Sequence, residues 1–401
     1  MREQFLVFGA PQIQQAEIDE VVATLESGWL GTGPRVARFE ADFAHYKGVD
    51  EHQVAAVNSC TAALHISMIA SGVGPGDEVI TSAMTFCATV NAIIHAGATP
   101  VLADIDPITM NIDPASVEAR ITPRTRAIIP VHFAGRPCEM DALCDIARRH
   151  GLMIIEDCAH AIETEYHGQK AGTFGDFGCF SFYVTKNVAT GEGGMVLARD
   201  EENIGRIKIL ALHGMSKDAW RRYDDEGFKH YKVVECGFKY NMMDIQAAIG
   251  IHQLARVEEN WRRRQAIWQR YQYAFANLPV TCPPDPAPGT RHGHHLYTLL
   301  IDQDRAGISR DELLDRLIDL NIGTGVHYLS IPEHPYYQQR FGWRVADYPH
   351  AYRVGQKTIS LPLSGSLEDQ DVADVVEAIR RSLLPTPQKI RRKIKFLSTM
   401  R

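Results

Sequence analysis

A single lysine stands between an apolar run and a glycine-rich turn. Residues 179–194 read CFSFYVTKNVATGEGG, so that Lys186 follows an aromatic, apolar stretch and precedes three glycines within four residues. The apolar stretch is typical of a buried strand, which places Lys186 where the strand gives way to a flexible turn. An amine delivered there can act as a nucleophile, so the pattern favours chemistry over solubility.

A carboxylate ends a second apolar run. Asp157 is the last residue of LMIIED, and ligands of open parallel sheets bind at the carboxyl ends of the strands. An ionised carboxylate beside apolar residues is costly unless a cation or several donors meet it. The protonated ring nitrogen of pyridoxal phosphate is one partner that fits. Lys186, 29 residues further on, could form an imine with the aldehyde of that cofactor and move a proton between two carbons.

The cofactor hypothesis also requires a phosphate site. The polar turn Asn58-Ser59-Cys60-Thr61 opens directly into the helical run AALHISMIA, where free amides and the positive end of a helix favour an anion. Any capped helix after a strand has a similar turn, so this signal is weak alone. Ser181 is a further candidate phosphate donor.

Two more side chains have both a functional and a structural interpretation. Phe86, in TSAMTFCAT, could stack on a flat ring or be a core aromatic. His160 could contact the ring hydroxyl or belong to the start of a helix. A structural interpretation also stays open for the central pair, in which Asp157 caps the next helix and Lys186 pairs with Glu192.

The elements that must position these residues alternate along the chain. Strand-like runs occupy 53–59, 77–83, 99–105, 126–133 and 152–159, and helical runs occupy 61–70, 87–97 and 140–151. Strands this uniformly apolar, separated by helices, predict a mostly parallel sheet that helices cover on both faces. The fold class is α/β.

A second region begins near Asp244. Residues 244–278 have the pattern of one long helix, and a strand at 297–302 and helices at 310–321 and 371–383 follow. We predict a large domain over 1–245 that binds the cofactor and a smaller α/β C-terminal domain over 246–401.

Composition excludes several classes of protein. The chain has 401 residues, 45% hydrophobic and 23% charged, with a net charge of -7, which argues against a nucleic-acid binder and favours small molecules. No apolar stretch is long enough to span a membrane and the N-terminus lacks the features of a signal peptide, so we expect a cytoplasmic protein.

Cysteines and histidines do not predict a metal site. The eight cysteines lack CxxC spacing and are expected to be reduced, packed thiols. HGHH at 292–295 precedes a predicted strand, so a histidine-rich strand edge is favoured over metal ligation. The basic tail 389–396 (KIRRKIKF) could bind a membrane surface or nucleic acid, but a solvated chain end is favoured.

Several segments together resemble the DegT/StrS family of sugar aminotransferases, which are pyridoxal-phosphate enzymes of the aspartate aminotransferase fold. The resemblance covers nearly the whole chain, in the correct order and spacing. The segments are GWLGTGP, VNSCTAAL, PGDEVITSAMTFCAT, IIEDCAHA, SFYVTKNVATGEGG and KYNMMDIQAAIG.

The resemblance implies a role for each matched residue. Lys186 is the lysine that forms the imine, Asp157 pairs with the ring nitrogen, and His160 lies near the ring hydroxyl. Cofactor contacts are also implied for Cys60, Thr61 and Ser181 at the phosphate and for Phe86 over the ring. Asn241 matches a position that reaches the phosphate of the neighbouring subunit, which implies a homodimer with its active site at the interface.

Two positions separate this chain from parts of the family. The phosphate turn often has glycine where this chain has Cys60, but the amide donor survives that change. Some relatives have histidine in place of Lys186 and remove a hydroxyl group, so the lysine disfavours dehydration.

The resemblance also implies a two-stage reaction. An amino acid, glutamate by resemblance, leaves its amine on the cofactor as pyridoxamine phosphate, which then aminates a nucleotide-linked 4-keto-6-deoxy sugar, with Lys186 moving the proton in both stages. The segments GTGVHY and HPYYQQRF look closer to relatives that act at carbon 4 than at carbon 3. The resemblance does not identify the nucleotide that carries the sugar. It also leaves open whether the product enters lipopolysaccharide, another glycan or a secondary metabolite.

Four residues are candidates on the sugar side. His327 and Tyr328 resemble a segment that lies beside the sugar ring, and His213 with Lys217 follows the catalytic strand in a loop that could reach a diphosphate. A packed histidine and a solvated lysine are the competing interpretation.

Two other functional classes were weighed. A non-catalytic sensor of sugar nucleotides would have lost Lys186 or Asp157, and both are present. A nicotinamide oxidoreductase would need a G-x-G-x-x-G turn after the first strand, where this chain has Asn-Ser-Cys-Thr.

Overall fold

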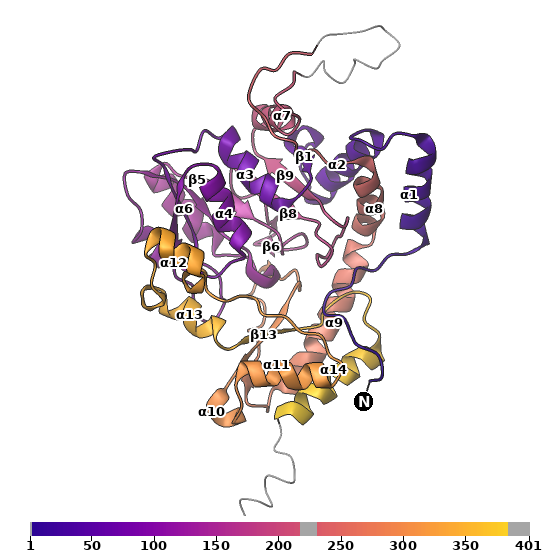
Figure 1. Cartoon of the computed structure of the whole chain (residues 1–401), viewed down its shortest axis with the longest axis vertical. Coiled ribbons are helices and arrows are strands. Elements are labelled where there is room, and N and C mark those ends of the chain that lie inside the picture. The colour runs from indigo at the N-terminus through magenta and orange to yellow at the C-terminus, as the bar shows by residue number, and fades with distance from the viewer. Residues whose placement is uncertain (1, 217–230, 384–401) are drawn as a thin grey trace, which may run out of the picture.

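A seven-stranded sheet forms the centre of the larger part of the molecule (Figure 1). The structure is a computed structural model that describes residues 2–216 and 231–383. The strand order is β1-β9-β8-β5-β4-β2-β3, and β9 alone runs against its neighbours. The strands are β1 (Val54–Val57), β2 (Glu78–Ser82), β3 (Thr99–Ala103), β4 (Thr125–Ile129), β5 (Met153–Asp157), β8 (Phe177–Ser181) and β9 (Gly194–Ala198).

Helices cover both faces of this sheet. Alternate residues of a strand point to opposite faces, so Val57 packs towards α3 and α7 while Ala56 packs towards α2 and α8. Apolar residues on both faces explain why β1, β2 and β9 are buried along their whole length. The helices of this part are α1 (Gln15–Ser27), α2 (Pro34–Lys47), α3 (Cys60–Ala70), α4 (Cys87–His95), α5 (Pro114–Glu118), α6 (Met140–His150), α7 (Glu201–Leu210) and α8 (Asp244–Ala255).

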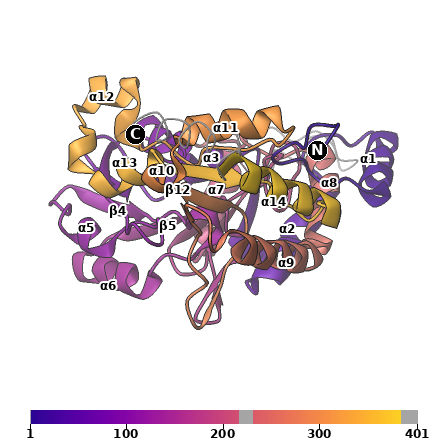
Figure 2. The ribbon, with the colours of Figure 1, turned by 90° about the horizontal axis from the view of Figure 1, so that it is seen from below.

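The C-terminal part has its own three-stranded antiparallel sheet, β10-β12-β13, with helices packed against it (Figure 2). Its strands are β10 (Val280–Thr281), β12 (Tyr297–Ile301) and β13 (Thr358–Leu361). Its helices are α9 (Val257–Phe275), α10 (Gln303–Ala306), α11 (Arg310–Asp319), α12 (Pro335–Phe341), α13 (Pro349–Gly355) and α14 (Asp369–Leu383). Leu6 belongs to the same core, so the N-terminal segment runs back across the molecule.

Short elements complete the structure. A small sheet joins β6 (Glu165–Tyr166), β7 (Gln169–Lys170) and β11 (Thr290–Arg291). Single 3₁₀ turns are η1 (Glu51–Gln53), η2 (Phe133–Gly135), η4 (Ile331–Glu333) and η5 (Val345–Asp347). Within the described ranges, no helix has both the length and the apolar character that crossing a membrane requires.

The α/β class and the mostly parallel sheet are confirmed. The single helix predicted over 244–278 is wrong in one respect, because the chain leaves helical geometry at Arg256, which separates α8 from α9. Helix α8 packs on α1 and α2, whereas α9 packs in the C-terminal core. The predicted boundary between domains at 245/246 stays a prediction.

Candidate active site

A cavity of about 530 Å³ lies at the carboxyl ends of β5 and β8, beside the start of α3. It is lined by most of the residues that the sequence singled out. They are Cys60, Thr61, Phe86, Asp157, His160, Ser181, Lys186, His327 and Tyr328. Residues as far apart in the chain as Cys60 and Lys186 are thus brought to one cavity, because parallel strands end at the same edge of the sheet.

The floor of the cavity is formed by Asp157, Thr89 and Lys186. Asp157 and Thr89 are buried and joined by a hydrogen bond, and Lys186 is partly buried. The Thr89 hydroxyl donates to Asp157 Oδ2 at 2.8 Å, and the Ala159 amide donates to Oδ1 at 3.1 Å. Thr85 and Thr89 hydroxyls lie 2.9 Å apart, which leaves Thr85 as the donor to Thr89. Burial raises the pKa of Asp157, while Thr89, the Ala159 amide and Lys186 oppose that rise. A cationic group in the cavity would therefore be favoured beside this carboxylate.

Lys186 is the cationic side chain beside Asp157. Burial lowers its pKa to about 8, and the neighbouring Cys60 and Asp157 act in the opposite direction. Near neutral pH a much larger fraction of this amine is unprotonated than for an exposed lysine, which suits a nucleophile. Among the described residues, Lys186 makes no ion pair with Glu192, so that structural interpretation is not supported.

The start of α3 offers donors for an anion. Ser59 caps the helix by accepting from the Ala62 amide at 3.1 Å, and Thr61 lines the cavity. The Cys60 thiol turns away and donates to the Cys179 carbonyl at 3.5 Å, and burial raises its pKa well above the usual value. The thiol is therefore neutral, and its presence in place of glycine leaves the amides of the turn available.

Gly194 of β9 packs directly against the backbone of this turn. A Cβ added at Gly194 would lie 2.5 Å from the Ser59 carbonyl carbon and 2.8 Å from the Cys60 nitrogen. The sheet can bring β9 this close to the turn only because position 194 has no side chain. Ser181 lies opposite Gly194 in the ladder, so both flank the same turn.

His160 is held as a neutral imidazole with a defined tautomer. Its Nδ1 accepts from the Ala134 amide at 3.2 Å, so the proton resides on Nε2, which faces the Tyr328 hydroxyl at 3.2 Å. Burial lowers the pKa of His160 well below its usual range. Burial and Asp157 raise the pKa of Tyr328, so Nε2 donates to a neutral phenol.

The mouth of the cavity, formed by Phe86, Tyr183 and Glu192, is open. The side chain of Phe86 is 58% exposed, and its ring lies 6.0 Å from that of Tyr328. Tyr183 is 45% exposed and Glu192 is exposed. Phe86 is thus not the core aromatic of the structural interpretation.

His327 connects the cavity to the C-terminal part. Its Nδ1 lies 2.9 Å from the Ser360 hydroxyl of β13, and its ring stacks on Phe8 with centroids 5.5 Å apart. Burial and nearby Lys186 lower its pKa to about 4, so the imidazole is neutral. Together with Tyr328, it gives the cavity a polar wall opposite the strand ends.

Three predicted residues lie elsewhere. His213 is exposed and does not line the cavity. Asn241 donates to the Thr32 hydroxyl at 2.7 Å, and its buried Oδ1 has no hydrogen-bond partner within the described residues. Lys217 and the basic tail at 389–396 lie outside the described residues.

His295 is a residue of the site that sequence reasoning missed. Its ring lies 4.3 Å from that of His160, and its Nδ1 lies 3.0 Å from Asn187 Oδ1. Asn187 uses its Nδ2 to donate to Glu163 and to the Gly293 carbonyl, so Nδ1 of His295 is the donor in their contact. The histidines of HGHH are buried rather than displayed at a strand edge.

One buried cluster, His132, Glu156 and Cys158, has the ligand types of a metal site. The carboxylate of Glu156 is already used in hydrogen bonds within the protein. It accepts from His132 Nε2 and from the amides of Gly172, Phe174 and Gly175. His132 Nδ1 accepts the Cys138 amide. These bonds fix the loops beneath the floor of the cavity.

Comparison with known proteins decides the family. The model of the DegT/DnrJ/EryC1/StrS aminotransferase family matches residues 11–380. The chain belongs to this family. It is 52% identical over 380 residues to the spore coat polysaccharide biosynthesis protein SpsC of Bacillus subtilis, covering 94% of this chain and 97% of that one.

Solved structures of the family have the same fold. The aminotransferase TlmJ from Streptoalloteichus hindustanus is 35% identical with a TM-score of 0.86, over 95% of this chain and 99% of that one. The PMP-form of the putative sugar aminotransferase Spr1654 from Streptococcus pneumoniae is 34% identical with a TM-score of 0.88, over 94% and 98%. The chain is accordingly a pyridoxal-phosphate-dependent aminotransferase of the DegT/DnrJ/EryC1/StrS family.

The residues present fit this cofactor. Asp157 is a buried carboxylate whose raised pKa would be relieved by a ring N–H, and the amides that start α3 suit a phosphate. Lys186 lines the same cavity as both of them.

Proposed function

We propose that the enzyme transfers an amino group from L-glutamate to a nucleotide-linked 4-keto-6-deoxy sugar and so forms a 4-amino sugar nucleotide. The observation that carries this proposal is the pairing of a weakly basic Lys186 with a buried Asp157 in a cavity large enough for a cofactor and part of a sugar. SpsC, named for polysaccharide biosynthesis, supports a product that is destined for a glycan.

Pyridoxal phosphate, when bound, supplies an aldehyde that takes up the donor amine and a ring that withdraws electrons from the reacting carbon. Asp157 holds the ring nitrogen in its protonated form, and Thr89 orients the carboxylate for that contact. Lys186 would hold the aldehyde through its amine and would carry the proton at the reacting carbon.

The remaining residues hold the cofactor in place. The turn at Cys60 and Thr61, with Ser181, binds the phosphate, and Phe86 covers one face of the ring. His160 is proposed to contact the ring hydroxyl, which would take the place of the Tyr328 hydroxyl as the partner of Nε2–H. His327 and Tyr328 are proposed contacts of the sugar ring, and His213 and Lys217 of the diphosphate.

We infer that the enzyme is a homodimer with the active site at its interface. An apolar stripe of Ile18, Val22, Leu25 and Trp29 is about half exposed on and after α1, and the mouth of the cavity is also open. Exposed apolar stripes of this kind are typical of protein interfaces. Asn241, whose side-chain Oδ1 accepts no hydrogen bond from the residues that the structure describes, is the residue proposed to reach the phosphate of the partner subunit.

The proposal is tested by the visible spectrum of the holoenzyme. L-Glutamate should bleach the cofactor band, and only one member of a panel of nucleotide-linked 3-keto and 4-keto sugars should restore it. Nuclear magnetic resonance of the product then locates the new amine at carbon 4. An amine at carbon 3 would favour the carbon-3 aminotransferase, and a protein that binds the nucleotides without any amine transfer would be a sugar-nucleotide sensor.

A further inference from the structure

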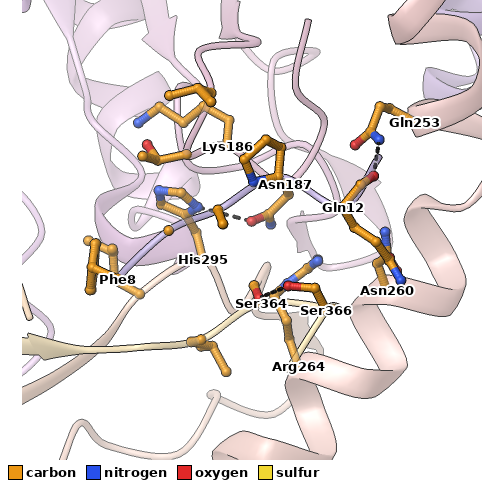
Figure 3. Close-up of a pocket in the computed structure, with 18 of the residues that line it drawn as sticks. Phe8, Gln12, Lys186, Asn187, Gln253, Asn260, Arg264, His295, Ser364 and Ser366 are labelled. Atoms are coloured by element: carbon orange, nitrogen blue, oxygen red, sulfur yellow. Dashed lines mark hydrogen bonds between the residues drawn. The ribbon is translucent and has the colours of Figure 1, made fainter. Parts of the chain in front are cut away.

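A second, smaller cavity of about 60 Å³ adjoins the first (Figure 3). We call it the rear chamber. Thr185, Lys186 and His327 line both cavities, so the rear chamber meets the main cavity at the reactive lysine. Its other walls come from the N-terminal segment Phe8–Gln12, from α8 and α9, and from residues 363–366 after β13.

A buried arginine with unused donors lines the rear chamber. Arg264, on α9, is only 2% exposed, and Nη2 is its single nitrogen with a hydrogen bond inside the described part of the chain, to Glu163. Its buried Nε has no partner. A guanidinium has five N–H donors, and buried donors are nearly always satisfied, so this side chain indicates an absent acceptor.

The charges around the rear chamber favour one negative group. Lys186 and Arg264 line the chamber, and Glu163 is the ion-pair partner of Arg264, so the formal charges of the three groups sum to +1 when the Lys186 amine is free and protonated. Both oxygens of Glu163 already accept from Asn187. Burial holds the pKa of His295 well below its usual range and that of His327 at about 4, so neither adds charge.

The size of the rear chamber and the chemistry of its arginine indicate that the ligand is a carboxylate group. About 60 Å³ is room for a carboxylate group with its adjoining methylene, and not for a sugar ring. The planar fork of arginine matches the two oxygens of a carboxylate. Ser364 and Ser366, whose hydroxyls lie 2.8 Å apart, and the Asn260 amide line the same part of the chamber and can add hydrogen bonds.

The position of Arg264 indicates which carboxylate of the donor binds in the rear chamber. Arg264 donates to Glu163, which accepts from Asn187, and Asn187 in turn accepts from His295. Figure 3 shows Arg264 on the side of this chain of hydrogen bonds that lies away from the Lys186 side chain. A group bound there belongs to the end of the donor remote from its amine.

We propose that the rear chamber binds the side-chain carboxylate of a dicarboxylic amino donor, with Arg264 as the cation that recognises it. The inference rests on the proposed function, in which an amino acid gives its amine at Lys186. It deepens that function by assigning a residue that distinguishes L-glutamate from uncharged amino acids.

The test measures how fast the cofactor band bleaches as a function of donor concentration. The donors are L-glutamate and its uncharged isostere L-glutamine, and the proteins are wild-type holoenzyme and the double variant Glu163→Gln/Arg264→Gln. The double change removes the buried pair as a unit, because a lone buried charge would destabilise the fold. The apparent Kd for L-glutamate should rise about tenfold or more, and that for L-glutamine should stay within about twofold.

Two further variants separate recognition from packing. Glu163→Gln alone leaves the buried Arg264 without its counter-charge, so the holoenzyme should melt at a lower temperature than the wild type, and the folded enzyme should bind L-glutamate more tightly. Arg264→Lys keeps the cation but loses the fork, and should give an intermediate loss for L-glutamate. A purely structural role for the pair would weaken both donors equally in every variant, and that result would overturn the proposal.

A binding measurement completes the test without any reaction. Calorimetric titration with glutarate, a dicarboxylate without an amine, should detect binding to the wild-type holoenzyme and about tenfold weaker binding or none to the double variant. Equal glutarate binding to the wild type and the double variant would contradict carboxylate binding in the rear chamber. It would leave the proposed function intact. Glutarate binding that depends on Arg264, in an enzyme inert to every amino acid, would support the chamber and overturn the proposed function.

Discussion

The floor and the mouth of the main cavity are built in opposite ways. At the floor, Asp157 is buried and receives hydrogen bonds from Thr89 and a backbone amide. At the mouth, Phe86 and Tyr183 are about half exposed. In the proposed homodimer, a single chain supplies the floor, and the open mouth is the part that the cofactor, the sugar and a second subunit would complete.

The largest effect is expected at the floor. Asp157→Asn keeps the shape of the side chain but removes the charge that holds the ring nitrogen protonated, so the rate of cofactor bleaching by L-glutamate should fall about 10²- to 10³-fold. Stopped-flow absorbance measures it. Thr89→Ser, which keeps the hydroxyl, is the matched control and should stay near the wild-type rate. An Asp157→Asn enzyme of full activity would contradict the role of the carboxylate.

The phosphate turn should be the next most sensitive place. Gly194→Ala drives a methyl group into the Ser59 and Cys60 backbone and should cost about 1–3 kcal/mol in unfolding free energy, together with weaker cofactor binding. Gly74→Ala is the control, since its added Cβ would meet only one atom, at 3.8 Å. Denaturant melts and a fluorescence titration with pyridoxal phosphate measure both effects. Equal behaviour of the two variants would show that the turn tolerates displacement.

Burial of the floor also predicts a pH dependence. Because burial lowers the pKa of Lys186 to about 8, the unprotonated amine increases as pH rises through 8 and levels off above it. Capture of pyridoxal phosphate by the apoprotein should therefore be about tenfold slower at pH 7 than at pH 9. A rate that still climbs steeply between pH 9 and 10 would mean that the lysine keeps the pKa of an exposed amine.

The smallest effect is expected at the mouth. Phe86→Ala removes a stacking face that is already half open, and the affinity for pyridoxal phosphate should fall only about two- to tenfold. Phe86→Tyr keeps the ring and should bind as the wild type does. A loss as large as that of Asp157→Asn would erase the distinction between floor and mouth.

Asp157, Lys186 and Cys60 could be predicted from sequence because each lies at or soon after the end of a strand, whereas Thr89, the third residue of the floor, lies within α4 and could not. Asp157 ends β5, Lys186 follows β8 by a few residues, and Cys60 begins the helix after β1. Parallel strands end at one edge of the sheet, so residues far apart in the chain converge there without any knowledge of side-chain packing.

The rear chamber could not be predicted in the same way. Arg264 is a polar residue within a long helix, where it looks like any solvated side chain, and only packing of α9 against the floor loops buries it. His295 comes from a segment whose histidines suggested a strand edge or a metal. The break at Arg256 gave no signal either, since the helical pattern continues across it.

The most direct test of the central claim locates the bond between cofactor and protein. Reduction of the holoenzyme with borohydride, followed by peptide mass mapping, should place the added mass of the reduced cofactor on Lys186. Lys186→Ala, folded as judged by its thermal melt, should carry no such mass and should transfer no amine. Attachment at another lysine, or amine transfer by Lys186→Ala, would contradict the assignment of this cavity as the active site.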